Sequence, residues 1–221
     1  MDHRQHCRGH AAGTTRVTAR IVVLASANGS NLQALLDASR DGSLDAEVVG
    51  VISNNPNAFA HTRAEQAGVP TATLELNSDE TREDYDIRLA SLVATFEPDF
   101  VVLAGWIRLL SMAFLAHYPR QVINLHPALP GEFPGTHAID RALQAHQRMG
   151  LERTGVMVHF VPDAGIDNGP VIATVEVPIE MNESLASLEA RVHAAEHTLL
   201  VQALQQLIHP PNETDGVPAR K

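Results

Sequence analysis

The sequence has little cysteine and no long apolar run. Cys7 is its only cysteine, which excludes an internal disulfide. No apolar segment approaches the roughly 20 residues that a transmembrane helix requires. The basic N-terminus also lacks the apolar stretch that marks a secretory signal. We therefore expect a soluble protein of a reducing cytoplasm, with no membrane partner.

Positive charge is also scarce. Sixteen Lys and Arg residues stand against 26 Asp and Glu residues, which gives a formal net charge of -10. This balance argues against a nucleic acid or an anionic membrane as the main partner. A local basic site for one anionic small molecule is compatible with it. Because 44% of the 221 residues are hydrophobic, the chain can fill one sizeable core.

From residue 21 onward, short apolar runs alternate with segments of helical period. The expected strands are 21–26, 48–53, 71–76, 100–105, 122–127, 154–161 and 171–178, and the expected helices are 31–39, 58–67, 83–96, 138–147 and 187–208. Such alternation is typical of βαβ units in a parallel sheet, and the last two strands are close enough to pair antiparallel. We predict an α/β fold with a Rossmann-like, open, mostly parallel sheet, an antiparallel C-terminal part and helices on both faces.

The ends of the chain differ in composition from its centre. Residues 1–19 have no apolar period, and residues 209–221 form a polar, proline-rich segment. We expect a flexible leader over 1–19, a single domain over 20–208 and a disordered tail over 209–221.

The first candidate site is the stretch LASANGSNL, residues 24–32. A strand, a glycine turn and a helix N-terminus together direct backbone N–H groups toward a position where a phosphate can bind. The segment matches neither the Walker loop nor the dinucleotide fingerprint. An ordinary Asn-Gly turn with Ser30 as helix N-cap explains the same residues equally well.

The second candidate is the stretch VINLHP, residues 122–127. Asn124 and His126 are two residues apart, so their side chains share one face of an extended strand. The carboxyl end of a strand in an open α/β sheet faces the ligand crevice, where an amide can stabilise negative charge and an imidazole can move a proton. A hydrogen-bonded core histidine with an asparagine capping the next turn is the alternative.

The third candidate is the loop DAGIDNGP, residues 163–170. Either Asp163 or Asp167 can reach a histidine and orient it, as the acidic member of a catalytic triad does. Turn-forming residues account for the same composition without any function.

Two clusters raise the question of a metal. His193, Glu196 and His197 match the H-x-x-E-H pattern of zinc hydrolases, but a third ligand from a downstream helix is missing. A second cluster comprises His3, His6, Cys7 and His10, in the expected leader. We predict no functional metal.

Five stretches occur in a fixed order: NGSNL, VVLAGWIRLL, NLHPALPGEFPG, GVMVHFV with DAGIDNGP, and ARVHAAEH. In this order and spacing, over residues 20–208, the chain resembles the glycinamide ribonucleotide formyltransferase family, folate-dependent enzymes of purine synthesis. The resemblance implies that the formyl group of 10-formyltetrahydrofolate is transferred to the amine of glycinamide ribonucleotide, with no metal. It implies small-molecule substrates only, and both a monomer and a homodimer are compatible with it.

The resemblance also implies roles for individual residues. The implied catalytic residues are Asn124, His126 and Asp167, with His159 nearby. The implied glycinamide ribonucleotide contacts are Gly29, Ser30, Asn31, His193 and Glu196. The implied folate contacts are Arg82, Ile107, Arg108, Leu109, Leu110, Asn124, Asp163, Ala164, Gly165 and Ile166. The chain departs from the family pattern at Ala27, at Pro130-Gly131 and at His193.

In the expected mechanism, Asn124 and a protonated His126 stabilise the oxyanion of a tetrahedral intermediate. Asp167 is expected to raise the His126 pKa and to keep the imidazole charged near neutral pH.

Three other functions are alternatives to this one. Formyltetrahydrofolate deformylase resembles this core with a preceding regulatory domain, for which 19 residues are too few. Methionyl-tRNA formyltransferase adds a C-terminal tRNA-binding domain, whereas this acidic chain ends soon after its last helix. A non-catalytic nucleotide-binding module has no need of the three catalytic residues together.

Overall fold

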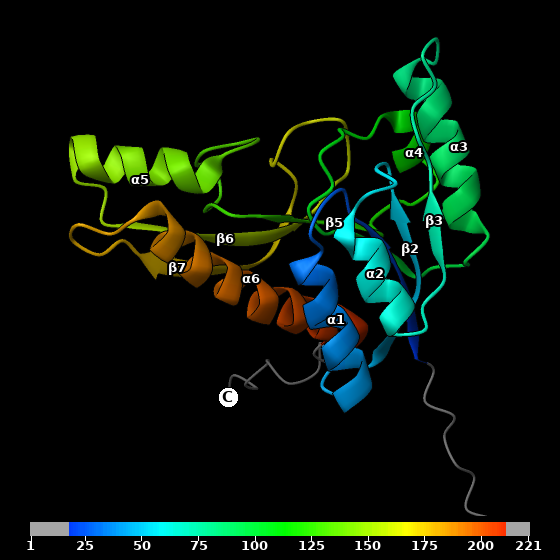
Figure 1. The fold of residues 1–221 in the computed structure, drawn as a ribbon, viewed down its shortest axis with the longest axis horizontal. Coiled ribbons are helices and arrows are strands. Elements are labelled where there is room, and N and C mark those ends of the chain that lie inside the picture. Colours follow the sequence, from blue (N-terminus) through cyan, green and yellow to red (C-terminus); the bar gives the residue numbers. More distant parts are fainter. Residues whose placement is uncertain (1–17, 211–221) are drawn as a thin grey trace, which may run out of the picture.

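The computed structural model describes residues 18–210, in which a seven-stranded sheet lies between two layers of helices (Figure 1). The strands are β1 (Ala19–Leu24), β2 (Ala46–Ser53), β3 (Thr71–Thr73), β4 (Phe100–Leu103), β5 (Val122–His126), β6 (Arg153–Phe160) and β7 (Val171–Pro178). The helices are α1 (Ser30–Asp41), α2 (Phe59–Gln66), α3 (Arg82–Ala94), α4 (Met112–Leu115), α5 (Ala138–Met149) and α6 (Leu185–Ile208).

The sheet has the order β3-β2-β1-β4-β5-β6-β7. Strands β1 to β5 pair in parallel, whereas β6 pairs antiparallel with both β5 and β7. The predicted mostly parallel, open α/β sheet with an antiparallel C-terminal part is therefore confirmed. The strand order reverses direction between β1 and β4, and this is where open α/β sheets bind ligands, beyond the carboxyl ends of the strands.

Alternate residues of β1 belong to the two opposite core layers. Ile21 and Val23 pack in the cluster that includes buried residues of α1, α2, α5 and α6. Val22 and Leu24 pack in the cluster that includes buried residues of α3 and α4. Since successive side chains of a strand point to opposite faces, a strand that is covered on both sides must be apolar at every position. This explains why β1 is continuously apolar from Ile21 to Leu24.

The two clearest departures from the expected elements concern β3 and α4. Strand β3 ends at Thr73, because its one neighbour, β2, ends at Ser53, the residue that pairs with Thr73. Helix α4 was not expected, since four residues are too few to display a helical period. Its buried Phe114 packs in the α3 layer, so tertiary packing rather than local pattern accounts for this helix.

Residues 1–17 and 211–221 lie outside the described part of the chain, and the expected leader and tail stay predictions. Strand β1 begins at Ala19, one residue before the expected start of the domain. Among residues 18–210, no helix combines the length and the apolar character needed to cross a membrane.

Candidate active site

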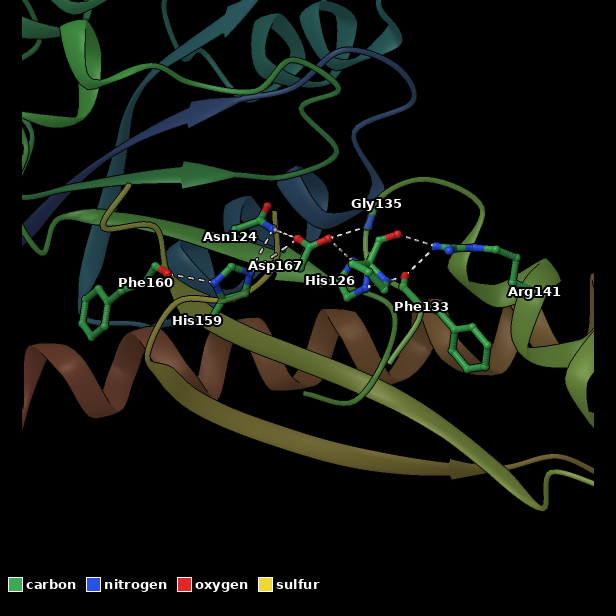
Figure 2. A network of polar contacts seen from close by, with 9 residues as sticks. Asn124, His126, Phe133, Gly135, Arg141, His159, Phe160 and Asp167 are labelled. Atoms are coloured by element: carbon green, nitrogen blue, oxygen red, sulfur yellow. Dashed lines mark hydrogen bonds and ion pairs between the residues drawn. The ribbon is translucent and has the colours of Figure 1, made fainter. Parts of the chain in front are cut away.

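The three expected catalytic residues meet at the carboxyl end of β5. Asn124 and His126 project from this strand, and Asp167 lies in the loop between β6 and β7 (Figure 2). The Asn124 amide nitrogen donates to Asp167 Oδ1 at 3.0 Å, and His126 Nδ1 lies 3.2 Å from Asp167 Oδ2. The Asp163 carboxylate instead accepts a bond from the Gly165 N–H at 2.8 Å. Asp167, not Asp163, is therefore the aspartate in contact with both Asn124 and His126.

A second histidine completes this cluster. His159 on β6 lies opposite Asn124 in the antiparallel ladder, and its Nδ1 is 2.8 Å from the Phe160 carbonyl oxygen. A carbonyl can only accept, so Nδ1 carries a proton, and in the tautomer with its proton on Nδ1 the Nε2 atom accepts from Asn124 Nδ2 at 3.1 Å. Both N–H bonds of the Asn124 amide are thus directed at protein acceptors, namely Asp167 and His159.

His126 is almost completely buried, with 4% of its surface exposed. Burial lowers the pKa of its imidazole below the usual value, although the Asp167 carboxylate and nearby backbone carbonyls act in the opposite direction. The expectation that Asp167 keeps this imidazole charged near neutral pH is therefore wrong. Asp167 has the expected effect on the pKa, but the loss of water around the ring outweighs it.

Both nitrogens of His126 face acceptors. Nδ1 faces Asp167, and Nε2 lies 3.1 Å from the carbonyl oxygen of Phe133. A neutral imidazole has one N–H and can donate to only one of these groups, whereas the imidazolium can donate to both. The surroundings are therefore arranged for the charged form, while burial keeps the resting ring neutral. Such a group is suited to accept a proton during a reaction.

Asp167 remains ionised in this cluster. Burial acts to raise its pKa, but the neighbouring His159 and the backbone N–H of Gly135 outweigh it, and the net pKa is lowered. The Gly135 N–H donates to Asp167 Oδ2 at 2.8 Å. The backbone of Asp167 is left-handed, with φ 49°, a conformation that costs a non-glycine residue on the order of 1 kcal/mol and clusters at functional sites.

The cluster opens into a cleft of about 320 Å³. All the expected folate contacts except Arg82 line it: Ile107, Arg108, Leu109, Leu110, Asn124, Asp163, Ala164, Gly165 and Ile166. Its mouth is apolar, since 70% of the Ile107 surface is exposed there. Arg82 does not line the cleft, but its Nε donates to the Leu109 carbonyl at 2.9 Å. We therefore attribute to Arg82 a contact that holds the cleft wall.

The expected phosphate loop lies at the start of α1. Gly29 is the N-cap, with φ 74°, and Ser30 is the first helical residue rather than the N-cap. A Cβ atom on Gly29 would lie 2.9 Å from the Ala60 side chain, so only glycine fits. Arg63 of α2 donates to the Asn28 carbonyl at 2.9 Å and to the Asn28 side chain at 2.8 Å. The loop is therefore rigid and has a guanidinium beside it.

Glu196 of α6 joins this loop to the last helix. Its buried carboxylate accepts from Asn31 Nδ2 at 3.2 Å and lies 2.7 Å from His193 Nδ1. The hydrogen bond to Glu196 raises the His193 pKa above its usual value, despite partial burial. The five residues that the resemblance assigns to the ribonucleotide thus gather around the N-terminus of α1, and their contact with the ribonucleotide stays a prediction.

The zinc-like pattern on α6 is accounted for differently. His193 and Glu196 pair with each other, and Asn31 shares the same carboxylate oxygen. Within residues 18–210, no group of three or more His, Cys, Asp or Glu side chains is arranged to hold a metal ion. The cluster His3, His6, Cys7 and His10 lies outside the described residues.

Four residues that contribute to the site have no recognisable signal in the sequence. Arg63 carries no motif, and Phe133 and Gly135 act through their backbone groups. Arg141 binds the backbone of the same loop, donating to the Phe133 carbonyl at 2.6 Å. A backbone contact leaves no side-chain pattern in a sequence, and only the pairs Pro130-Gly131 and Pro134-Gly135 could have indicated a tight loop.

An amide, an imidazole and a carboxylate at the carboxyl edge of a doubly wound sheet are suited to acyl-group transfer. A family model described as formyl transferase matches residues 19–204, and the chain belongs to this family. The phosphoribosylglycinamide formyltransferase of Schizosaccharomyces pombe is 45% identical over 204 residues, covering 87% of this chain and 98% of the relative. That of Escherichia coli is 43% identical, covering 81% and 82%. Glycinamide ribonucleotide transformylase 1 from Symbiobacterium toebii superposes with a TM-score of 0.83 at 34% identity, covering 90% and 92%.

Proposed function

We propose that this chain transfers the formyl group of 10-formyltetrahydrofolate to the primary amine of glycinamide ribonucleotide, giving formylglycinamide ribonucleotide and tetrahydrofolate. The observation that carries the proposal is the contact of Asn124 and His126 with one Asp167 carboxylate at the edge of an apolar cleft. The named activity of the relatives that match most of the chain supports the same reaction.

In this reaction the amine nitrogen attacks the formyl carbon, and the carbonyl oxygen becomes negatively charged. The new C–N bond forms before the bond from the formyl carbon to N10 of the folate breaks. One proton must leave the amine and another must reach N10. His126 is the proposed carrier, since its lowered pKa leaves it neutral at the start. Once protonated, it donates to both Asp167 and the Phe133 carbonyl.

Asn124 is the proposed donor to the developing oxyanion. Its two N–H bonds are directed at Asp167 and His159 before substrate is present. An oxyanion is a stronger acceptor than a neutral imidazole nitrogen, so we expect it to replace His159 as the partner of one N–H. Such an exchange favours the tetrahedral intermediate over the planar formyl group, as catalysis requires.

The two substrates are assigned to the two halves of the site. The glycinamide ribonucleotide phosphate is assigned to the N-terminus of α1, where Gly29, Ser30 and Asn31 lie. The folate is assigned to the cleft with the apolar mouth, since a pteridine ring needs an apolar wall and a few polar groups to orient it. The transferred carbon then lies between the two, beside Asn124.

The reaction is tested by incubating the protein with 10-formyltetrahydrofolate and with glycinamide ribonucleotide present, absent or replaced by charged methionyl-tRNA. We expect tetrahydrofolate to form only with glycinamide ribonucleotide. Formate release without an amine acceptor would instead identify a deformylase, and transfer to the tRNA would identify the other formyltransferase. No turnover under any condition would favour a nucleotide-binding module.

The catalytic residues are tested by Asn124→Ala and His126→Ala. A preorganised donor to an oxyanion contributes on the order of 3 kcal/mol, so each change is expected to lower kcat about 100-fold or more. The matched control is His117→Ala, because His117 is an exposed histidine outside the cleft. Near-normal kcat in a folded Asn124→Ala or His126→Ala protein would refute the assignment.

A further inference from the structure

The loop between β5 and α5, residues 127–137, contributes backbone groups to the reaction centre. The Phe133 carbonyl oxygen lies 3.1 Å from His126 Nε2, and the Gly135 N–H donates to Asp167 at 2.8 Å. Neither His126 nor Asp167 belongs to this loop. The geometry of both therefore depends on how firmly the loop is held.

This loop has an unfavourable backbone conformation at the point of contact. Phe133 has φ 44°, in the left-handed region that costs a non-glycine residue on the order of 1 kcal/mol, and His137 has φ 57°. Such conformations persist only where the surrounding structure fixes them. Something other than the local chain must therefore hold the Phe133 carbonyl toward His126.

Arg141 of α5 supplies that contact. Its Nη2 donates to the Phe133 carbonyl at 2.6 Å and to the Pro134 carbonyl at 2.7 Å (Figure 2). Its guanidinium also lies 5.9 Å from the centre of the Phe133 ring. Two successive carbonyls and one side chain of the loop are thus gathered by a single residue.

The backbone of Arg141 belongs to helix α5, which packs in the core. Helix α5 buries Ile139, Ala142 and Leu143 in the cluster that also contains β6 and α6 residues. Because Arg141 lies between these buried positions on the helix, its backbone cannot move without disturbing the core. The residue therefore connects a rigid element to a strained loop.

We propose that Arg141 is a positioning residue for the reaction, which acts through the Phe133 carbonyl on His126 and through Gly135 on Asp167. It touches neither reacting group. It keeps an acceptor in place opposite His126 Nε2, so that the ring finds two acceptors when it gains a proton. This inference rests on the proposed function, because it assigns Arg141 to the same proton transfer.

Three variants test the proposal. Arg141→Met keeps the length of the side chain and removes its donors, Arg141→Lys restores one cationic donor, and Arg148→Met is the matched control at an exposed position of the same helix. We expect Arg141→Met to lower kcat at least about tenfold, since small displacements of catalytic groups reduce rates strongly. The KM values for both substrates should stay within about twofold of the original, and Arg141→Lys should recover most of kcat.

A merely structural role predicts a different result. In that case Arg141→Met would lower the melting temperature and leave kcat unchanged at temperatures where the protein is folded, and this result would overturn the proposal. A large rise in KM with unchanged kcat would overturn it too. Failure of the proposed function is recognised separately, because the unaltered protein would then show no formyl transfer.

If Arg141→Met does not fold, Arg141→Gln replaces it. Equal kcat values for Arg141→Gln and Arg141→Lys would then contradict the proposal, and a lower kcat for Arg141→Gln would support it.

Discussion

At the scale of single residues, His126 shows how a buried site can favour two protonation states at different stages. Desolvation lowers its pKa and keeps the resting ring neutral. Asp167 and the Phe133 carbonyl stand ready to accept from both nitrogens once the ring is protonated. The first effect acts on the resting ring, and the second acts once the ring is protonated.

The charge of Asp167 can be tested through the pH dependence of the reaction. A base must be neutral to act, so kcat should fall as the pH drops below the His126 pKa. The Asp167 carboxylate raises that pKa, and Asp167→Asn should therefore shift the acid limb of the kcat profile to lower pH while lowering kcat throughout. The measurement is kcat between pH 5 and 8. Asp163→Asn is the control, and an unshifted limb in Asp167→Asn would contradict the assignment.

His193 gives a second prediction that depends on pH. Its pKa is raised by Glu196, so the imidazolium persists below that raised pKa and is lost as the pH rises through it. If the substrate phosphate binds at the nearby N-terminus of α1, the KM for glycinamide ribonucleotide should rise as the pH increases through the His193 pKa. His193→Lys should keep KM low at all pH values, and His193→Gln should make it high throughout. Parallel KM profiles for the three proteins would show that His193 does not face the phosphate.

At the scale of elements, the start of α1 depends on a backbone conformation and on its neighbour. Gly29 and Gly42 cap the two ends of α1 with φ 74° and φ 81°. Only Gly29 is in close contact with another element, since a Cβ there would meet Ala60 of α2. Both positions therefore require a left-handed backbone, but only the position of Gly29 also lacks space for a side chain.

Alanine substitutions at Gly29 and Gly42 separate the effect of the left-handed backbone from the effect of contact with Ala60. Each substitution should destabilise the protein by about 1 kcal/mol, because alanine disfavours the left-handed region. Gly29→Ala should cost more than Gly42→Ala, and it alone should raise the KM for glycinamide ribonucleotide. Urea denaturation and steady-state kinetics measure the two effects. Equal losses of stability with equal KM values would show that contact with Ala60 does not shape the loop.

The departure at Pro130-Gly131 also has an explanation at this scale. The Glu132 N–H donates to the Leu129 carbonyl at 3.0 Å, and Gly131 has φ 79°. Proline and glycine at the two central positions are typical of a type II turn. The Leu129 side chain packs where Gly155 of β6 has no Cβ. This turn brings Phe133 back toward His126, which the sequence pattern alone did not reveal.

At the scale of the whole molecule, the sheet brings together residues that are far apart in the chain. Asn124 and Asp167 are separated by 43 positions, and Asn31 and Glu196 by 165. Asn124 and Asp167 meet at the carboxyl end of β5, and Asn31 meets Glu196 because α1 packs against the middle of α6. A substitution in the core, away from the cleft, can nonetheless lower the stability of the fold without changing the geometry of the site.

Leu200→Ala tests this separation. Leu200 is fully buried in the α6 layer of the core, and its truncation should lower the free energy of unfolding by about 2–5 kcal/mol. The folded protein should keep its kcat, since the residue does not line the cleft. Urea denaturation and kinetics at a temperature well below the melting transition provide the comparison. A loss of kcat larger than the loss of folded protein would show that α6 packing controls the site.

The sequence by itself determined the fold class, most elements and the residues around which the site is built. Apolar runs reveal strands buried on both faces, and Asn124, His126, Asp167 and the Gly29 loop carry recognisable side-chain patterns. Only the tertiary structure decided the direction of the His126 pKa shift and the backbone contacts made by Arg141. The physical reason is that desolvation and backbone contacts depend on what surrounds a residue in space, and neither leaves a pattern along the chain.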